Sequence, residues 1–541
     1  MLLEQARELE DSGDFAMAAE LYGRLLTDQP DDPAVLSAIG RLLGRRGQLD
    51  AAVAHYAQAT SLCPADPGLW LDFGLLLGRT GHDEMAKRAL LSAASLNPDD
   101  PSLLSALADA LRERRLFEDA VRQYRRLTEI MPSLAAAYNN LGITLLDLGR
   151  RNEAFEPFRR AAEIDCNMPE AIGNLAMLTV ERGQNEAAVG LYAHLRQLRP
   201  DLVQGPLNQG VAFYRMGRLA EAAAALKDAV ALEPDHAQAH YDLAQVLLLK
   251  GDWAEGFREY EWRWRYAGFP SQRLLFFQPL WQGERLANGT LLVHAEQGLG
   301  DSLQFCRLLP KAARACGGKV IFLCPPPLMD ILSGLENVVL VPEGQEPPPF
   351  DAYCPLLSLA HLLEPGFAVP SPYLAAPMAK PFARQEGKLN VGLIWAGNPK
   401  HGRDFLRSLP LELLGRLPVH DGIAYHSLQY QPAEGWRDAF GASVEDLSPA
   451  IAGFADLADA MTAMDLVISI DSAPAHLAGA LGRPCWLLLH HLPDWRWGMA
   501  GANTSWYPSL RLYRQSQPRD WASVIDKVAV DLTRLAEAGR A

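Results

Sequence analysis

The chain has 541 residues, of which 49% are hydrophobic and 21% are charged, and its formal net charge at pH 7 is −15. This length is too great for a single hydrophobic core, so two or three domains are expected. The negative charge argues against non-specific binding to nucleic acid and leaves room for local basic pockets that bind anions.

No apolar run approaches the roughly 20 residues that a membrane span needs, so no transmembrane segment is predicted. The opening stretch, MLLEQARELEDSGD, lacks the basic region and the long apolar region of a secretory signal. The seven cysteines are scattered and form no C-x-x-C pair. This pattern favours free thiols in a reducing compartment over disulfides or zinc, and it predicts a cytoplasmic protein.

Residues 1–265 repeat every 34 residues. Prolines keep this spacing at 30, 64, 98, 132, 200 and 234, with Cys166 in the vacant place. Glycines keep it at 13, 47, 81, 149, 183, 217 and 251, with Arg115 as the exception. Alanines keep it at 18, 52, 86, 120, 154, 188 and 222, and Gly256 ends the column. Aromatic residues keep it at 22, 56, 124, 158, 192 and 260.

These residue types predict a pair of antiparallel helices in each repeat. Glycine allows a left-handed turn between the helices, alanine lets their backbones approach, the aromatic residue fills the space between neighbouring pairs, and proline ends the second helix. The pattern, with its Leu-Gly pair in YNNLGITLLDLGRRNEAF, resembles the tetratricopeptide repeat. About eight such units would stack into a solenoid with a long concave groove.

Three asparagines in the first helices of the repeats also stand 34 residues apart, at Asn140, Asn174 and Asn208, and Asp72 and Asp242 occupy the same column. An asparagine ladder can donate and accept hydrogen bonds along the main chain of an extended peptide. The alternative is that asparagine is a common polar filler at this point of the repeat.

After a connector at 266–287, the pattern changes to short β-branched runs that alternate with helical segments, which is typical of α/β folds. One unit is predicted at 288–380 and a second at 388–541, with a proline- and alanine-rich linker at 368–388. Strands are expected at TLLVHAE, KVIFLCP, NVVLVPE, DAYCPLL, NVGLIWAGN, IAYHSLQ, DLVISID, PCWLLL and RLYRQ. Ligands of such sheets bind beyond the carboxyl ends of the strands, so the active site is expected in a cleft between the two units.

Two of the strand-end loops open a helix. After the first strand come Glu296, Gln297, Gly298, Leu299, Gly300 and Asp301. After DLVISI come Asp471, Ser472, Ala473, Pro474, Ala475 and His476. The free N–H groups and positive dipole at a helix start suit the phosphate of a nucleotide sugar.

A third loop, NPKHGRDFLRS, follows NVGLIWAG and is basic within an otherwise acidic chain. It contains Asn398, Lys400, His401, Arg403 and Arg407. An anionic donor would gain charge-assisted hydrogen bonds from these cations.

The GLGD loop of the first unit and SIDSAPAHLAGALGRP of the second resemble the two signature regions of heptosyltransferase-like glycosyltransferases with the GT-B fold, over roughly residues 288–535. Repeats followed by such a unit are similar to bacterial tetratricopeptide-repeat glycosyltransferases, some of which modify flagellin. The resemblance implies an α-solenoid followed by two Rossmann-like units in a GT-B arrangement. It also supports a groove that clamps a peptide acceptor through the three asparagines.

In that family the aspartate of the Gly-Asp motif is the general base that takes the proton of the acceptor hydroxyl, which assigns this role to Asp301. A carboxylate near a helix start can reach a hydroxyl in a cleft. The competing interpretation is a helix cap, which would stabilise the protein by about 0.5–2 kcal/mol without any chemistry.

The other site residues have weaker grounds. Gly298, Gly300, Asp471, Ser472, Ala473 and His476 are predicted to bind the donor, although Asp471 could simply cap its helix and His476 could bond a backbone carbonyl. Gln429 is placed near the nucleotide base or ribose by position alone. Asp494 and Arg496 could reach the sugar, whereas the surrounding Trp495, Trp497, Trp506 and Tyr507 are expected to pack in the core or a lid.

The sequence thus predicts an inverting glycosyltransferase that moves sugar from a nucleotide-sugar co-substrate to a hydroxyl of a protein, flagellin among the candidates. It needs no other cofactor. No D-x-D pair ends a strand, so metal independence is expected, with cations and helix dipoles stabilising the leaving group. The alternatives are a transferase for lipopolysaccharide or another glycan, and a non-enzymatic scaffold. The first α/β unit is short, which predicts that the last repeats pack against it.

Overall fold

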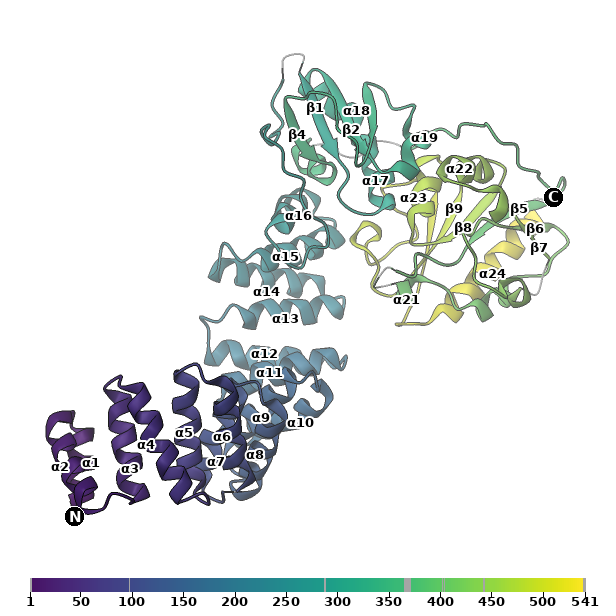
Figure 1. Ribbon diagram of the computed structural model, residues 1–541. Coiled ribbons are helices and arrows are strands. Elements are labelled where there is room, and N and C mark those ends of the chain that lie inside the picture. The colour runs from purple at the N-terminus through teal and green to yellow at the C-terminus, as the bar shows by residue number, and fades with distance from the viewer. Residues whose placement is uncertain are drawn as a thin grey trace. The chain divides into compact units, whose positions relative to one another are not determined.

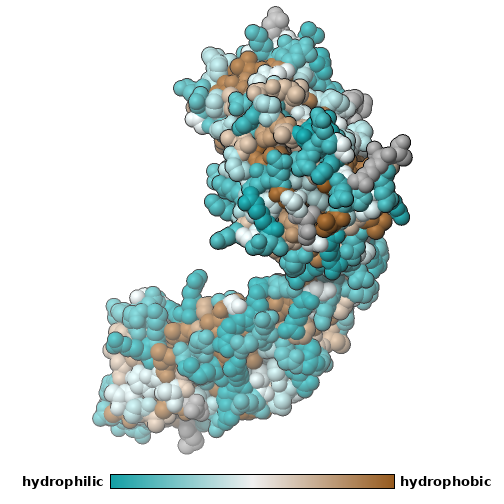
Figure 2. All heavy atoms as spheres, turned by 90° about the vertical axis from the view of Figure 1, so that its right-hand side faces the viewer, coloured by the Kyte–Doolittle hydropathy of each residue, from teal (hydrophilic) through white to brown (hydrophobic). Residues whose placement is uncertain are grey.

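The computed structural model describes residues 2–96, 98–286, 289–363, 371–400, 402, 404–440 and 443–538. The chain forms two compact units, Met1–Asn208 and Gln209–Ala541, and the boundary between them falls inside a repeat. Figure 1 shows the order of the elements along the chain. Hydrophilic residues cover most of the face seen in Figure 2, with apolar residues in patches among them.

Among the described residues of the repeat region, the helices form eight pairs, as the period of 34 predicts. The pairs are α1 (Leu2–Asp11) and α2 (Phe15–Asp28), α3 (Pro33–Arg45) and α4 (Leu49–Leu62), α5 (Pro67–Arg79) and α6 (Asp83–Ser95), α7 (Pro101–Glu113) and α8 (Phe117–Ile130), α9 (Ala135–Asp147) and α10 (Arg151–Ile164), α11 (Pro169–Glu181) and α12 (Asn185–Leu198), α13 (Gln204–Arg215) and α14 (Leu219–Leu232), and α15 (Ala237–Lys250) and α16 (Trp253–Tyr260).

The periodic residues do what their chemistry predicts. The glycines between the paired helices have positive φ, from Gly13 at 86° to Gly251 at 90°, and Arg115 takes the same left-handed conformation at 58°. Several first helices begin with proline after an aspartate whose carboxylate caps the helix, as at Asp32, Asp66 and Asp100. The turn chemistry of the sequence therefore sets the helix boundaries.

The aromatic column packs inside each pair, which differs from the prediction that it fills the space between pairs. A Cβ added to Gly142 of α9 would lie 2.7 Å from the ring of Phe158 of α10, and one added to Gly40 would lie 2.7 Å from Tyr56. The small residue on the first helix makes room for the ring on the second. Because the two positions are 16 residues apart, this contact is local.

The described residues of the second half form two parallel sheets, each with its strands in doubly wound order. The first holds β1 (Thr290–His294), β2 (Lys319–Cys324), β3 (Val338–Pro342) and β4 (Ala352–Pro355) in the order β3-β2-β1-β4. The second holds β5 (Leu389–Ile394), β6 (Ile423–Ser427), β7 (Val444–Asp446), β8 (Leu466–Ile470), β9 (Cys485–Leu489) and β10 (Leu510–Arg514) in the order β10-β9-β8-β5-β6-β7. All nine predicted strands are present, and among the strands of the described residues only the three-residue β7 was not predicted.

Helices complete the two α/β parts. They are α17 (Leu299–Phe305), α18 (Leu309–Cys316), α19 (Met329–Leu332), α20 (Leu359–Leu362), α21 (Asp404–Arg407), α22 (Phe454–Thr462), α23 (Ala473–Ala480) and α24 (Trp521–Ala538). Strands such as β6, β8 and β9 are buried along their whole length, as parallel strands covered on both faces must be.

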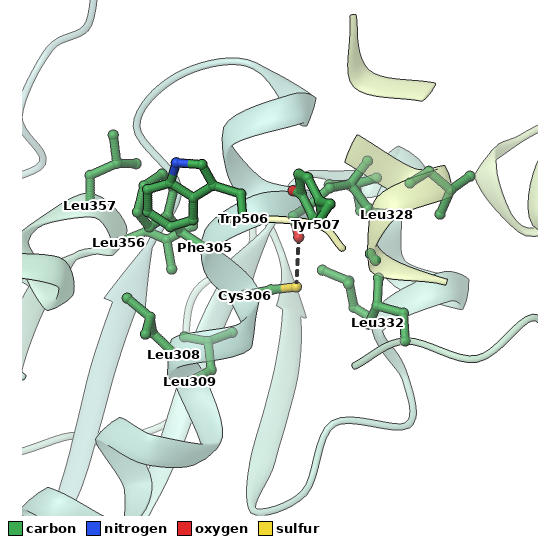
Figure 3. Packing of buried hydrophobic residues seen from close by; sticks show 14 of the residues in the cluster. Phe305, Cys306, Leu308, Leu309, Leu328, Leu332, Leu356, Leu357, Trp506 and Tyr507 are labelled. Carbon is green, nitrogen blue, oxygen red and sulfur yellow. Dashed lines mark hydrogen bonds between the residues drawn. The ribbon is translucent and has the colours of Figure 1, made fainter. Parts of the chain in front are cut away.

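The last repeat shares a core with the first α/β part. Leu248 of α15 and Phe257 of α16 belong to the same buried cluster as Leu303, Phe305 and Leu309. Figure 3 shows Trp506 beside Phe305 and Leu356, with Tyr507 on the side of Leu328. This shared core explains why the compact unit begins at Gln209. It also confirms that the last repeats pack against the short first α/β part.

Candidate functional site

The two loops that the sequence singled out meet in the structure. The first follows β1 and opens α17, and the second follows β8 and opens α23. A Cβ added to Gly300 would lie 3.0 Å from Cδ2 of His476 and 3.5 Å from Cα of Ala473. The absence of a side chain at Gly300 therefore lets the two helix starts touch, at the place where the sequence predicted a cleft between the two α/β units.

Asp301 is largely buried and each of its carboxylate oxygens has a partner. Its Oδ2 accepts the N–H of Gly298 at 2.9 Å, which caps α17 from within the first turn. Its Oδ1 pairs with Nη2 of Arg496. The N-cap place expected as the alternative role of Asp301 belongs to Gly298, and Asp301 caps the helix from the third helical position through the Gly298 N–H. This bond does not exclude proton transfer, because an ionised carboxylate has about four acceptor positions.

Burial sets the protonation behaviour of Asp301. Removal from water raises the pKa of its carboxyl group, the Arg496 guanidinium opposes that rise, and the Asp494 carboxylate adds to it. A pKa above the ordinary range of aspartate brings a carboxylate closer to the pH at which a general base works best.

Arg496 is the main partner of Asp301, and it lies in a 3-10 turn (Trp495–Trp497) after β9. Its Nη1 bonds Oδ1 of Asp494 at 2.7 Å, and its Nε bonds Oε1 of Gln304 on α17. The sequence suggested that Arg496 reaches the sugar, whereas the structure pairs it with the candidate base. Nothing in the spacing of residues 301 and 496 could have predicted this pair.

Asp471 and Ser472 lie where β8 gives way to α23. Burial raises the pKa of Asp471 to about 6, the Asp494 carboxylate adds to the rise, and the Trp497 side chain opposes it. Ser472 is extended at the N-cap position, and its hydroxyl donates to the Ile470 carbonyl at 3.2 Å. The Asp471 side chain does not take the N-cap place proposed as its alternative role.

His476 is fixed by side chains rather than by the backbone carbonyl expected as its alternative partner. Its Nδ1 lies 2.9 Å from the hydroxyl of Tyr507, and its ring stacks on Trp497 with centroids 5.3 Å apart. Burial lowers the pKa of His476 well below its usual range, and the cations Arg496 and Arg307 lower it further. The imidazole is therefore neutral and forms part of the wall beside Gly300.

The basic loop after β5 lies next to the loop after β8. Nη1 of Arg407 donates to the carbonyl of Asp471 at 3.3 Å, and its Nε pairs with Asp404 at 3.1 Å. Oδ1 of Asn398 accepts the N–H of the exposed Lys400 at 3.0 Å. His401 and Arg403 lie outside the described residues. Arg407 thus joins the two loops that flank the point where strand order reverses.

The side chain of Gln429 hydrogen-bonds backbone groups and does not point into a binding site. Its Oε1 accepts the N–H groups of Trp395 and Ala396 at 3.0 and 2.9 Å. Its Nε2 donates to the carbonyls of Ala396 and Tyr430 at 3.1 and 3.2 Å. These four bonds occupy the amide, so the observed role of Gln429 is to tie the ends of β5 and β6 together.

Asn140, Asn174 and Asn208 occupy equivalent places on α9, α11 and α13, and all three are half-buried. Nδ2 of Asn140 donates to Asp109 at 3.4 Å, and its Oδ1 accepts from Asn139 at 3.5 Å. These long bonds leave room for exchange with a peptide main chain. The period of the ladder is present, and its use for binding stays a prediction.

Sequence reasoning missed the link between the last repeat and the loop that carries Asp301. Arg263 follows α16, and its side chain is fully buried. It bonds both oxygens of Glu296, at 2.7 and 3.2 Å, as well as Glu261 at 2.7 Å and Ser358 at 2.8 Å. The departure of EYEWRWRY from the repeat pattern was the available signal.

Gln297 strengthens the same link, since its Nε2 donates to the Tyr260 hydroxyl at 2.9 Å. The aromatic run packs here too, as the core interpretation predicts. Trp506 stacks on Trp253 with centroids 5.0 Å apart, and Trp495 meets Phe257 edge to face at 5.6 Å. The last helix pair therefore forms one side of the candidate site.

A cavity of about 290 Å³ lies beyond this link, at the carboxyl end of β4. Its lining includes Arg258, Glu261, Trp281, Ser358 and His361. Across the part of the chain that the structure describes, no group of three or more His, Cys, Asp or Glu side chains is arranged to hold a metal ion. In the same residues, no helix combines the length and the apolar character needed to span a bilayer.

Comparison with known proteins supports the repeats. A family model described as tetratricopeptide repeat matches residues 3–67 and 207–267, and a second model with the same description matches 134–164. The amino-terminal half is thus a solenoid of tetratricopeptide repeats. Protein FlbA of Caulobacter vibrioides (strain ATCC 19089 / CIP 103742 / CB 15) is 26% identical over 384 residues, which cover 63% of this chain and 63% of FlbA.

Solved structures match at low similarity. YrrB, described as a TPR protein with an unusual peptide-binding site, is 20% identical and covers 34% of this chain and 95% of its own, with a TM-score of 0.30. MamA is 21% identical and covers 29% of this chain and 91% of its own, with a TM-score of 0.28.

Proposed function

We propose that the protein is an inverting glycosyltransferase of GT-B type that moves sugar from a nucleotide-sugar donor to a hydroxyl group of a protein acceptor. The observation that carries this proposal is the meeting of Gly300 with Ala473 and His476. It brings Asp301, from the loop after the first strand of one sheet, to the helix start after β8 of the other.

The donor is assigned to the second sheet because of its strand order. Numbered within the sheet, that order is 3-2-1-4-5-6, and ligands of such folds bind at the strand ends where the order reverses, here between β5 and β8. The loops that flank this point carry Lys400, Arg407 and Ser472. A diphosphate there would gain charge-assisted hydrogen bonds and the dipole of α23.

The proposed reaction is a single displacement. Asp301 takes the proton of the acceptor hydroxyl as the acceptor oxygen bonds the anomeric carbon, and the bond between that carbon and the diphosphate breaks with its electrons going to the diphosphate. Lys400 and Arg407 stabilise the charge on the leaving group. Transfer is expected to persist in EDTA, because the sequence places no D-x-D pair at a strand end.

The repeats are assigned to the acceptor, since tetratricopeptide solenoids offer an extended surface for protein partners. Flagellin is the first acceptor to test. The seven cysteines are all free, which suits the cytoplasm, where nucleotide sugars would meet a newly made acceptor. The reaction, donor and acceptor are all parts of the proposal.

A donor panel and a mass measurement test it. The purified chain is screened for thermal stabilisation and hydrolysis with UDP-, GDP-, CDP- and dTDP-sugars, and intact mass is measured on flagellin co-expressed with it. A sugar-sized mass increment supports the proposal. An increment on a glycan instead of the protein would favour the lipopolysaccharide or glycan alternative. Absence of both stabilisation and turnover with every donor would leave a repeat scaffold.

Asp301→Asn separates the base from the cap, because asparagine keeps a side-chain oxygen that can accept the Gly298 N–H but has no carboxylate to take a proton. Transfer should fall by about 10²- to 10⁴-fold while the melting temperature changes little. Asp100→Asn is the matched control, since Asp100 caps α7 by accepting the Leu103 N–H at 2.8 Å. If both variants keep wild-type turnover, Asp301 is a cap alone.

A further inference from the structure

Arg496 connects the two α/β parts at the candidate base. Asp494 and Arg496 follow β9 of the second sheet, whereas Asp301 and Gln304 belong to α17, which follows β1 of the first. Arg496 bonds all three of these partners, and only 8% of its side chain is exposed. A guanidinium so removed from water interacts strongly with the carboxylates around it.

Packing fixes the plane of this guanidinium. Its carbon lies 4.3 Å from the ring centre of Trp495 and 5.9 Å from that of Phe305. The guanidinium presents its N–H donors in a rigid planar fork, so an arginine held on its faces and edges also holds its partners. Asp301 is thereby held in one rotamer.

The charges around the pair come from several elements. Asp494 and Glu296 raise the pKa of Asp301 in addition to burial, whereas Arg496 lowers it. Tyr260 of α16 also lies near Arg496, and because burial raises the pKa of its hydroxyl well above the ordinary value, Tyr260 is neutral there. Arg496 in turn acts on Asp471 and His476. Among the groups that act on Asp301, Arg496 is therefore the cation that opposes the effect of burial and of two neighbouring carboxylates.

We propose that Arg496 is a positioning residue that holds Asp301 ionised and oriented to accept the acceptor proton, and that it makes a base carried by one sheet depend on a residue carried by the other. This inference rests on the proposed glycosyl transfer. Each oxygen of Asp301 keeps a lone pair beyond its bond to Arg496 or Gly298. The proton leaves the acceptor hydroxyl for Asp301 while Arg496 stays protonated throughout.

The first experiment compares Arg496→Gln, Arg496→Lys and the wild type with the panel nucleotide sugar that gives the highest turnover. Arg496→Gln should lower kcat by about 100-fold, since displaced catalytic groups lose about this much, with little change in KM for the donor. It should also shift the acid limb of the pH profile to higher pH, because the cation that lowers the pKa of Asp301 is gone. Arg496→Lys should return the acid limb of the pH profile to its wild-type position but recover only part of the wild-type kcat.

Arg511→Gln is the matched control. Arg511 also belongs to the second sheet, pairs with Asp531 at 2.8 Å and lies 5.0 Å from the ring centre of Tyr513. Neither contact involves Asp301 or α17. This variant should keep the wild-type kcat and pH profile.

A double-mutant cycle detects a merely structural role. If Arg496 acts through Asp301, adding Arg496→Gln to Asp301→Asn should cost no further activity, because the base is already absent. If Arg496 only supports the fold, the two losses multiply and the melting temperature falls in step with kcat. Arg496→Lys covers the case in which the glutamine variant does not fold.

The outcomes separate the two proposals. Wild-type protein that neither binds nor turns over any donor overturns the glycosyltransferase proposal and this inference with it. Two results with active wild-type protein overturn the inference alone. In the first, Arg496→Gln has the same kcat and pH profile as Arg511→Gln. In the second, the activity losses of Arg496→Gln and Asp301→Asn multiply in the double mutant.

Discussion

Two buried carboxylates, Glu10 in the first repeat and Glu296 after the last, show how one kind of interaction serves two purposes. Glu10 accepts the Tyr22 hydroxyl at 2.9 Å and pairs with Arg41 and Arg45 of the next helix pair. Glu296 pairs with Arg263 and is followed by Gln297, which bonds Tyr260. The first network joins neighbouring repeats, whereas the second joins a repeat to the loop that carries Asp301.

Residues of one repeat column therefore have different roles in the two units. Tyr22 and Tyr260 stand in the same aromatic column, yet Tyr22 bonds another repeat helix and Tyr260 bonds the loop after β1. The lesson is that the last repeat keeps the repeat pattern inside its own helix pair and gains a new partner outside it. Four pairs of substitutions test how far this difference extends.

The largest expected effect comes from Arg263→Gln compared with Arg41→Gln. Arg263 and Glu296 are both fully buried, so removing the cation strands a charge and should cost about 3–5 kcal/mol of unfolding free energy. Arg41 is 36% exposed and Glu10 keeps Arg45, so its loss should cost about 1 kcal/mol or less. Denaturant unfolding with hydrogen exchange would assign each loss to its unit; equal losses would contradict the comparison.

Asp242→Asn compared with Asp72→Asn tests how two residues of one repeat column affect the pH dependence of stability. Burial raises the pKa of Asp242 to about 6, and the Gln238 side chain weakly opposes the rise. Because the folded state binds the proton more tightly, this group's stabilisation is complete below about pH 4 and is lost as pH rises through 6.

Asp242→Asn should therefore remove that loss and stabilise the protein at pH 7 by at most about 3 kcal/mol. Burial also raises the pKa of Asp72, but both the Tyr56 hydroxyl and Arg41 oppose it, so Asp72→Asn should give less. Melting temperatures from pH 4 to 8 measure both, with the exposed Asp421→Asn as control. A wild-type slope in Asp242→Asn would refute the assignment.

Gly142→Ala compared with Gly210→Ala tests the column of small residues on the first helices, against which a side chain of the second helix packs. The new methyl group would lie 2.7 Å from the Phe158 ring in one case and 2.6 Å from Cγ of Leu226 in the other. Overpacking should cost about 1–3 kcal/mol, and the rigid ring should make Gly142 the costlier site.

Gly190→Ala on α12 is the control, because no atom lies within 4 Å of the added carbon. It should stabilise its helix by about 0.5–1 kcal/mol. Urea midpoints compare the three variants, and a Gly142→Ala protein as stable as the control would show that the pair can spread without cost.

The smallest effect is expected from Tyr260→Phe compared with Tyr22→Phe. Each loses one hydroxyl hydrogen bond, worth about 1 kcal/mol. Tyr22→Phe should affect stability alone, since Glu10 keeps its arginines. Tyr260→Phe should also lower transfer, because Gln297 loses a partner beside the loop of Asp301. Parallel turnover and melting measurements decide this; identical activity in both variants would place Tyr260 outside the site.

Much of the architecture could be predicted because it rests on local chemistry. The glycine column takes positive φ, the second helices end just before the prolines, and nine hydrophobic runs form strands, all within short stretches of sequence. β7 was not predicted because it has only three residues, two of them charged and none fully buried, so it shows no hydrophobic alternation. The aromatic column was placed between pairs although it packs within each pair, since period alone does not say which neighbour a ring meets.

The candidate site was only partly predictable. Gly300, Asp301, Ala473 and His476 were expected near one another because loops at the carboxyl ends of parallel strands gather at one edge, and the structure does bring Gly300 against Ala473 and His476. Their roles in binding and catalysis stay predictions. The same rule placed Gln429 at this edge, but its amide hydrogen-bonds the backbone at the ends of β5 and β6. Arg263 was missed because its buried partners come from two loops outside the repeat, and no spacing marks them.

The sequence alone determined the repeat, the strands and the helix starts, because each depends on contacts between residues close in the chain. Only the tertiary structure decided that Arg496 meets Asp301 across 195 residues and that Arg263 ties the last repeat to Glu296. Buried ion pairs are specified by where folding places two charges away from water, and that placement depends on the packing of the whole unit.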